Sequence, residues 1–209
     1  MLLNEYSSKL LEIAVNELAR LPGIGKKTAL RLALYILKED GSFAENLSSA
    51  IVKMRSEIVF CKKCNNISDA EICDICANNK RDENTLCVVE DTRDVLAIEN
   101  TAQYNGLYHV LGGVINPMDG VGPNDLYIRH LIERIHTEEI NEVILALPAT
   151  VEGDTTNFYI YKLIKEFDVQ VTTIARGVAI GDELEYTDEI TLGRSILNRL
   201  PFESSIKRS

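Results

Sequence analysis

Apolar residues recur at helical spacing through the first sixty positions, in three series separated by breaks. In the first break Pro22 precedes two glycines that flank Ile24, and Asp40-Gly41-Ser42 closes the second series. We therefore expect three amphipathic helices, at residues 8–20, 26–38 and 45–59.

The pattern changes beyond residue 85, where short apolar runs alternate with segments of helical spacing. The polar stretch Asn78–Asn84 before this change is typical of a linker. Alternation of this kind predicts an α/β domain whose mostly parallel sheet is covered by helices. The expected strands are residues 86–89, 107–111, 142–147 and 169–174. The expected helices between them are residues 92–103, 124–137 and 155–167.

Four of the five cysteines form two CxxC pairs that lie between the helical region and the predicted sheet. Four thiolates complete the closed tetrahedral shell of structural zinc, which leaves no position for a catalytic water. The alternatives are a redox-active CxxC or buried free thiols. Cys87 stands alone on a strand-like run and is expected to be a buried core thiol. We expect one zinc ion per chain, bound by Cys61, Cys64, Cys73 and Cys76.

The composition is that of a globular protein, with 45% apolar residues and no Trp. Few aromatic residues are available to form stacking platforms for single-stranded bases. The N-terminus lacks the basic region of a signal peptide, and no segment has the apolar length of a membrane span. We expect a cytoplasmic protein that does not associate with membranes, in which reduced cysteines bind metal.

The formal net charge of −10 argues against DNA binding, but the charge is unevenly distributed. Residues 1–87 carry 12 basic and 12 acidic residues, whereas residues 88–209 carry 10 basic and 20 acidic residues. A local basic face in the neutral half can bind phosphate, with an affinity that is sensitive to salt. The basic residues that fall together there, with no acid between them, are Arg20, Lys26, Lys27 and Arg31.

The break between the first two predicted helices is the candidate DNA contact. Its glycines allow a tight turn and a close approach to a ligand. The free N–H groups at the start of the next helix favour an anion. The alternatives are an ordinary structural corner and a module that pairs with a second copy. We expect a phosphate grip that does not read base sequence, formed by Gly23, Gly25, Lys26, Lys27 and Arg31.

Acidic side chains follow two of the predicted strands. Glu90 and Asp94 come after the first strand, and Glu152 and Asp154 come after the third. Ligands of an open α/β sheet bind beyond the carboxyl ends of its strands, and such carboxylates could hold Mg²⁺. The alternative is that these acids are solvated and cap the starts of helices, where a negative charge is favourable.

The glutamate after one strand and the acidic pair after a later strand resemble the Toprim domain of primases and topoisomerases. The order of modules in the whole chain resembles the bacterial RecR family of recombination mediators. The strings that carry this resemblance are LARLPGIGKKTALRLA, CKKC followed by CDIC, CVVEDTRDVLAIE, YNGLYHVLGGVINPMDGVGP, TVEGDTTNFYI and IARGVAIGDELEYTDEITLGRS. Departures from the family pattern are Lys26, where relatives often have Pro, Leu147 in place of Asn, and Glu152 in place of Asp.

The resemblance implies four parts. They are a helix-hairpin-helix DNA-binding domain at residues 1–56, a four-cysteine zinc finger at 57–80, a Toprim domain at 81–175, and a C-terminal extension at 176–209 involved in assembly.

The resemblance also implies a non-enzymatic role. Members of the family form ring-like oligomers, and with RecO and RecF they help to load the RecA recombinase on gapped or single-stranded DNA. Lys27 and Arg31 match the basic residues tied to DNA binding. RecO would then dock on the acidic surface formed by Glu90, Asp94, Glu152 and Asp154. The resemblance also implies that the protein is located at the nucleoid.

Two other functions remain open at this point. One is an enzyme, a Mg²⁺-dependent nuclease or primase that uses the same acids, although the chain offers no evident nucleophile. The other is a protein-interaction scaffold that never contacts DNA, which the net negative charge favours.

Overall fold

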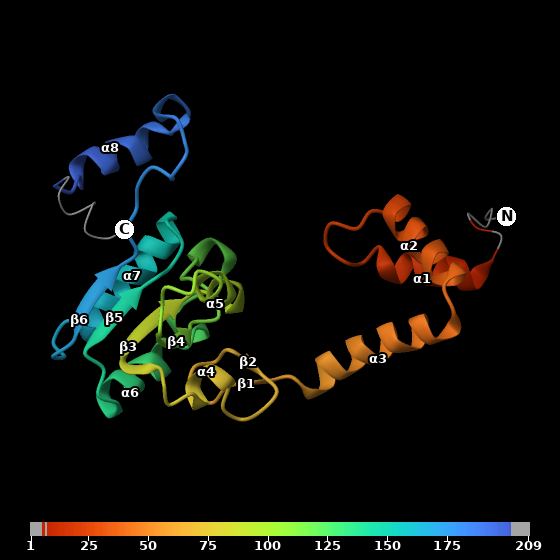
Figure 1. The fold of residues 1–209 in the computed structure, drawn as a ribbon, viewed down its shortest axis with the longest axis horizontal. Coiled ribbons are helices and arrows are strands. Elements are labelled where there is room, and N and C mark those ends of the chain that lie inside the picture. The colour runs from red at the N-terminus through yellow and green to blue at the C-terminus, as the bar shows by residue number, and fades with distance from the viewer. Residues whose placement is uncertain (1–5, 7, 202–209) are drawn as a thin grey trace. The chain divides into compact units, whose positions relative to one another are not determined.

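The computed structural model describes residue 6 and residues 8–201. The chain divides into two compact units, one that ends at Ile58 and one that begins at Val59 (Figure 1). None of the helices in the described part is both long and apolar enough to cross a membrane.

In its described residues, the N-terminal unit contains three helices, as predicted. The first two pack through Val15, Ala29 and Ala33, which are fully or almost fully buried. The small alanine side chains let the two helix backbones approach closely, and Ile24 of the connecting turn packs against the same cluster. The helices are α1 (Lys9–Leu18), α2 (Lys26–Lys38) and α3 (Gly41–Glu57).

The boundary between α2 and α3 differs from the prediction. Residues 40–42 were expected to close the second helix, with the third beginning near residue 45. Instead Asp40 is the N-cap of α3, and its carboxylate accepts a hydrogen bond of 3.1 Å from the N–H of Phe43. Aspartate at an N-cap satisfies an N–H group that the helix leaves unpaired, so the same residue that ends one helix starts the next.

The second unit begins with the cysteine segment. A two-stranded antiparallel ribbon holds the first cysteine pair, and a single helical turn holds the second. These elements were not predicted, because they are too short to show a hydrophobic period. They are β1 (Val59–Phe60), β2 (Ile67–Ser68) and α4 (Asp74–Ala77).

The sheet of the second unit has four strands in the order β4-β3-β5-β6, and every neighbouring pair is parallel (Figure 1). This confirms the predicted α/β class. The predicted linker is shorter than expected, because β3 already begins at Asp82 and pairs there with Gly106. The strands are β3 (Asp82–Val89), β4 (Gly106–Val110), β5 (Glu142–Leu145) and β6 (Gln170–Thr173).

Helices cover both faces of this sheet. Side chains alternate along β3, so Leu86 and Val88 face the core formed with α6 and α7. Cys87 and Val89 face the opposite core, formed with Val95 of α5. Cys87 is therefore a buried core thiol, as expected. The helices are α5 (Thr92–Glu99), α6 (Ile128–Thr137) and α7 (Val151–Ile164).

All three predicted helices of this domain differ from their predicted bounds, and α5 ends at Glu99, four residues before the predicted end. Residues 124–127 are not part of α6, because a short 3₁₀ turn, η2 (Pro123–Asp125), precedes the helix. α7 begins four residues earlier than predicted, since the Thr150 hydroxyl accepts a hydrogen bond of 3.1 Å from Gly153 and caps the helix. The chain also contains elements that the pattern did not show, η1 (Pro117–Asp119), η3 (Leu184–Tyr186) and α8 (Glu189–Leu197).

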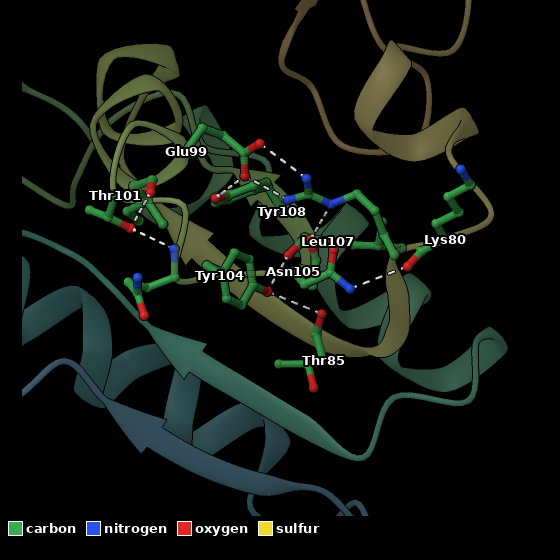
Figure 2. A network of polar contacts seen from close by, with 12 residues as sticks. Lys80, Thr85, Glu99, Thr101, Tyr104, Asn105, Leu107 and Tyr108 are labelled. Carbon is green, nitrogen blue, oxygen red and sulfur yellow. Dashed lines mark hydrogen bonds and ion pairs between the residues drawn. The ribbon is translucent and has the colours of Figure 1, made fainter. Parts of the chain in front are cut away.

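A polar network fixes the start of β3 against α5 and β4 (Figure 2). The guanidinium of Arg81 donates to both carboxylate oxygens of Glu99, at 2.6 and 3.0 Å, and to the carbonyl of Gly106 at 2.9 Å. The Tyr108 hydroxyl donates to the same carboxylate at 2.7 Å, and the Tyr104 hydroxyl lies 2.7 Å from the carbonyl of Leu107. Tyr104 and Tyr108 thus have structural roles on the α5 side of the sheet.

Candidate functional site

The turn between α1 and α2 has the geometry of a tight hairpin. Gly23 has a φ of +79°, a left-handed conformation that an L side chain would strain. The N–H of Ile24 donates to the carbonyl of Leu21 at 3.1 Å and closes the turn. Gly25 is the N-cap of α2, and no atom lies within 4 Å of the position where its Cβ would be. A ligand can therefore approach the backbone at Gly25.

The first turn of α2 contains no acid of its own, and no side chain caps the helix. Lys26, Lys27 and Arg31 are all exposed, and Lys27 and Arg31 are four residues apart, so they lie on one face. Arg20, before the turn, forms an ion pair with Glu17 at 2.8 Å. The structure thus presents outward N–H groups beside positive side chains.

The four cysteines of the two CxxC pairs come together as the spacing predicted. Their sulfur atoms all lie within 4.8 Å of one another. Cys61 and Cys64 are almost completely buried, and the Cys64 and Cys73 sulfurs are 3.6 Å apart. The N–H of Cys73 donates to the sulfur of Cys61 at 3.3 Å, the kind of hydrogen bond that stabilises a thiolate ligand. The donor set fits a single structural Zn²⁺.

Both lysines beside the first cysteine pair form ion pairs. Lys62 pairs with Glu71, and the ammonium of Lys63 lies 3.6 Å from the carboxylate of Glu138 on the segment after α6. Lys63 therefore joins the cysteine segment to the sheet domain.

The first cysteine turn also packs directly on the edge strand β4. The carbonyl of Cys64 accepts a hydrogen bond of 2.8 Å from the N–H of Val110. Asn65 has a φ of +61°, and its side-chain amide lies 3.2 Å from Nδ1 of His130 on α6. The metal module and the sheet are thus joined through backbone and side chains. Sequence reasoning missed Asn65 and His130, which only the folded chain brings together.

Glu90 lies at the carboxyl end of β3, as predicted. Its backbone carbonyl accepts a hydrogen bond of 2.9 Å from Gly112 in the loop after β4. Burial, and then the negative charge of Asp94, raise the pKa of Glu90 above its ordinary value. Asp94 itself takes part in a capping box at the start of α5, where its carboxylate accepts a hydrogen bond of 3.0 Å from the N–H of Asp91. Asp94 therefore has a local structural role.

Glu152 and Asp154 both lie in the first turn of α7. The two carboxylate oxygens of Asp154 accept hydrogen bonds of 2.6 and 3.1 Å from the guanidinium of Arg176, beyond β6. This ion pair lowers the pKa of Asp154 below its ordinary value. Arg176 was not singled out from the sequence. Its position just after the last strand was the available signal, because the carboxyl ends of parallel strands meet at one edge.

Gly153, between these two acids, lies inside the first turn of α7. A Cβ at this position would lie 2.0 Å from the carbonyl oxygen of Pro148. Glycine is thus required because the chain after β5 passes directly against the helix.

The acids of this edge do not gather as metal ligands do. Within residues 8–201, the four cysteines form the one cluster of at least three potential metal ligands. Asp94 and Asp154 already have hydrogen-bonding partners in the protein. The geometry therefore offers little support for a Mg²⁺ site.

Comparison with known protein families supports the modular organisation. A model described as "RecR, helix-hairpin-helix" matches residues 11–55, and the model of the RecR four-cysteine zinc finger domain matches residues 58–78. A "Toprim domain" model matches residues 84–175, and a "RecR, C-terminal" model matches residues 177–200. The zinc finger match agrees with the cysteine geometry, so the protein has one structural zinc site.

The chain is similar over almost its whole length to proteins named "Recombination protein RecR". It is 58% identical to the protein of Flavobacterium psychrophilum, over 98% of this chain and 100% of that protein. It is 58% identical to that of Porphyromonas gingivalis, over 99% and 100%, and 59% identical to that of Bacteroides fragilis, over 97% and 98%. With this identity and coverage, and with a structure that has the same modules, the chain belongs to the RecR family of recombination proteins.

Proposed function

We propose that this protein is a DNA-binding recombination mediator that forms a ring-like oligomer. With RecO and RecF it would help to load RecA on gapped or single-stranded DNA, at the nucleoid. Membership of the RecR family places it in DNA recombination and repair. The observation that carries the DNA-binding part is the start of α2, which exposes N–H groups and basic side chains without an acid or a side-chain cap.

The proposed DNA contact is made to phosphate and carries no sequence information. Gly23 and Gly25 shape the turn, the first N–H groups of α2 face the anion, and Lys26, Lys27 and Arg31 supply the charge. Four parts of the chain would then divide the work, with boundaries at residues 1–56, 57–80, 81–175 and 176–209. The first part would bind DNA, the second would be structural, and the last two would serve docking and assembly.

The DNA contact is tested by reversing two charges. Lys27→Glu with Arg31→Glu is expected to abolish binding to a labelled oligonucleotide at moderate salt, because it places repulsion beside the phosphate. The matched control is Lys53→Glu with Arg55→Glu, which makes the same change in net charge on exposed positions of α3. If both double variants bind DNA as the unmodified protein does, the hairpin is not the DNA site.

The acidic carboxyl edge of the sheet is the proposed docking surface for RecO, by charge complementarity. Its candidate residues are Glu90, Asp94, Glu152 and Asp154. Asp94 and Asp154 also hold the structure together, so the test uses the other two. Glu90→Arg with Glu152→Arg is expected to weaken the affinity for RecO, measured by calorimetry. Glu139→Arg with Asp168→Arg, near the amino ends of the strands, is the matched control. Equal affinities in all three proteins would contradict this docking site.

We also infer that the Toprim domain of this protein is not catalytic. The support is the ion pair between Asp154 and Arg176, which takes up one acid of the expected metal site. A Mg²⁺-dependent nuclease or primase is the alternative function. Incubation of labelled DNA with the protein and Mg²⁺ decides between them. DNA cleavage that is lost in Glu90→Gln would establish the enzyme and remove this part of the proposal.

The mass of the assembled protein tests the proposed ring-like oligomer. Native mass spectrometry with and without DNA is expected to show a defined multiple of the 23.4 kDa chain in both states. A monomer at working concentrations would contradict a ring.

A further inference from the structure

Among the described residues, one ion pair makes the polar connection between the segment after β6, residues 174–201, and the rest of its unit. Within residues 8–201, the hydrogen bonds and ion pairs recorded between this segment and the sheet domain all join Arg176 to Asp154. The other hydrogen bonds of the segment, such as those of Asp188 and Ser195, stay inside it. Most of its side chains are exposed. This contact is therefore the polar link between the segment of α8 and the sheet domain among the described residues.

The pair has the geometry of a specific guanidinium site. Both carboxylate oxygens of Asp154 face both terminal nitrogens of Arg176, at 2.6 and 3.1 Å, and this parallel arrangement is the one that distinguishes arginine from lysine. Arg194 of α8 adds a second positive charge that acts on the same carboxylate. Two arginines of one segment thus act on one acid at the start of α7.

The contact is also accessible and reversible. The Arg176 side chain is 30% exposed and the Asp154 side chain is 42% exposed. Ion pairs with this exposure are weak and screened by salt. Glu152, two residues away in the same helical turn, has no recorded side-chain partner among the described residues. A second guanidinium that reached this turn would meet the carboxylate of Glu152 and, once Arg176 moves away, the carboxylate of Asp154.

We propose that Arg176 and Asp154 form a latch for the C-terminal segment, and that an arginine-bearing segment of a docking protein opens this latch by taking the place of Arg176. The opening of the latch by a docking protein rests on the proposed function, which assigns docking to this acidic edge. The latch itself does not rest on it. Docking at Asp154 and release of α8 are then coupled. By thermodynamic linkage, any interaction that holds α8 in its latched position lowers the affinity for the docking protein.

The latch is tested without any partner, by electron spin resonance distances. One spin label replaces Lys165, after α7, and the other replaces Asn198, after α8, in protein diluted with unlabelled chains. The unmodified background should give two resolved distances, with the latched distance in excess over the released one. Arg176→Gln and Asp154→Asn should each shift the ratio of latched to released molecules by roughly two- to five-fold, the range expected for one exposed ion pair.

The matched control is Glu152→Gln, which removes the same charge from the same helical turn. It should keep the latched-to-released ratio of the unmodified background. The double variant Arg176→Gln with Asp154→Asn should shift the ratio no further than either single variant. The latch is overturned if the single variants leave the ratio unchanged, or if Glu152→Gln shifts it equally. Unchanged circular dichroism spectra and melting temperatures show that the variants remain folded.

The competition is tested with a nonapeptide of arginine as the probe. Added to the labelled protein, it should increase the released population, and a nonapeptide of lysine should do so more weakly, because lysine lacks the planar fork. The peptide should have no further effect on Asp154→Asn. If the distribution of the unmodified protein does not respond to the arginine peptide, competition at this site is refuted while the latch stands. Failure of RecO to bind the protein at all would instead refute the proposed docking function.

Discussion

Two acids at the same edge of the sheet have opposite electrostatic environments. Burial and the neighbouring Asp94 raise the pKa of Glu90, whereas the guanidinium of Arg176 lowers the pKa of Asp154. Asp154 is paired within the chain, whereas Glu90 lies partly buried beside a second acid.

The pH dependence of stability tests the environment of Glu90. A glutamate with a raised pKa in the folded state disfavours folding once it ionises, so its penalty is absent at low pH and grows as the pH rises through the folded pKa. Glu90→Gln is therefore expected to be more stable than the unmodified protein at pH 7, and the difference should vanish below about pH 4. Urea unfolding at both pH values measures it. A variant that is less stable at pH 7 would contradict the assignment.

His109 is a second residue whose surroundings decide its charge. It is fully buried, and Arg134 donates a hydrogen bond of 2.9 Å to the neighbouring carbonyl of Tyr108. Burial, and then the positive charge of Arg134, lower the pKa of His109 to about 3. The residue is thus a neutral part of the core, where its ring lies 3.0 Å from the carbonyl of Tyr127.

Acid should destabilise the protein partly through His109. Its pKa is about 6.5 in the unfolded chain, so between pH 6.5 and about 3 only the unfolded state takes up the proton. Stability should fall with decreasing pH in this range, by at most about 1.4 kcal/mol per pH unit. His109→Asn should show a shallower fall in calorimetric unfolding. Equal slopes in the two proteins would show that His109 does not contribute.

At the scale of elements, the start of α7 depends on close contact with the chain that leaves β5. Thr150 caps the helix, and Gly153 lies where the carbonyl of Pro148 leaves no space for a Cβ. The same helical turn carries two acids of the proposed docking surface. The position of those acids is therefore fixed by a packing constraint and a cap, and does not depend on a metal.

Gly153→Ala is expected to destabilise the protein by about 2–3 kcal/mol, since the backbone of residue 148 must move to admit a methyl group. Gly193→Ala is the matched control, because Gly193 lies within α8 and no atom is within 4 Å of its Cβ position. Alanine there should stabilise the helix by up to about 1 kcal/mol. Urea denaturation compares the two. Equal effects of both substitutions would contradict the packing argument.

The folding of the zinc module should depend on bound metal, because its two short strands and one helical turn bury little besides the cysteines. Metal would supply much of its folding energy. We expect close to one zinc per chain by elemental analysis, and much less in Cys73→Ala. Cys87→Ala is the control and should retain the metal, since Cys87 lies in the sheet core. Zinc lost equally in both variants would contradict the assignment of ligands.

At the scale of the whole molecule, the proposed DNA contact and the acidic docking surface lie in different units of the chain. The first 87 residues are neutral and the remainder carries the whole negative charge. In the proposed function, this separation would let an acidic protein bind DNA through one unit while the other repels DNA and attracts a basic partner.

The salt dependence of DNA binding tests the nature of the contact. Because each neutralised phosphate releases counterions, the logarithm of affinity should fall linearly with the logarithm of salt concentration. Lys27→Ala with Arg31→Ala should reduce this slope by about 2. Fluorescence anisotropy at several salt concentrations measures it. An unchanged slope with reduced affinity would show that the two residues do not contact phosphate.

Much of the architecture follows from local sequence signals. The spacing of the cysteines determined the metal site, and the alternation of apolar runs determined the parallel sheet, since both depend on residues that act at short range. Helix ends were less predictable, because Asp40 and Thr150 cap helices that the apolar pattern alone placed elsewhere. α8 was not predicted, because its nine residues span little more than two turns and show few repeats of a helical period.

The sequence by itself determined the candidate acidic and basic residues, the zinc ligands and the glycine turn before α2. Only the tertiary structure decided what these groups do. It paired Asp154 with Arg176 across 22 positions of sequence, placed Asn65 against His130 across 65, and set Gly153 against Pro148. The sequence pattern carries no signal for these contacts. The fold of the chain brings their residues together, whereas the spacing of residues along one element does not.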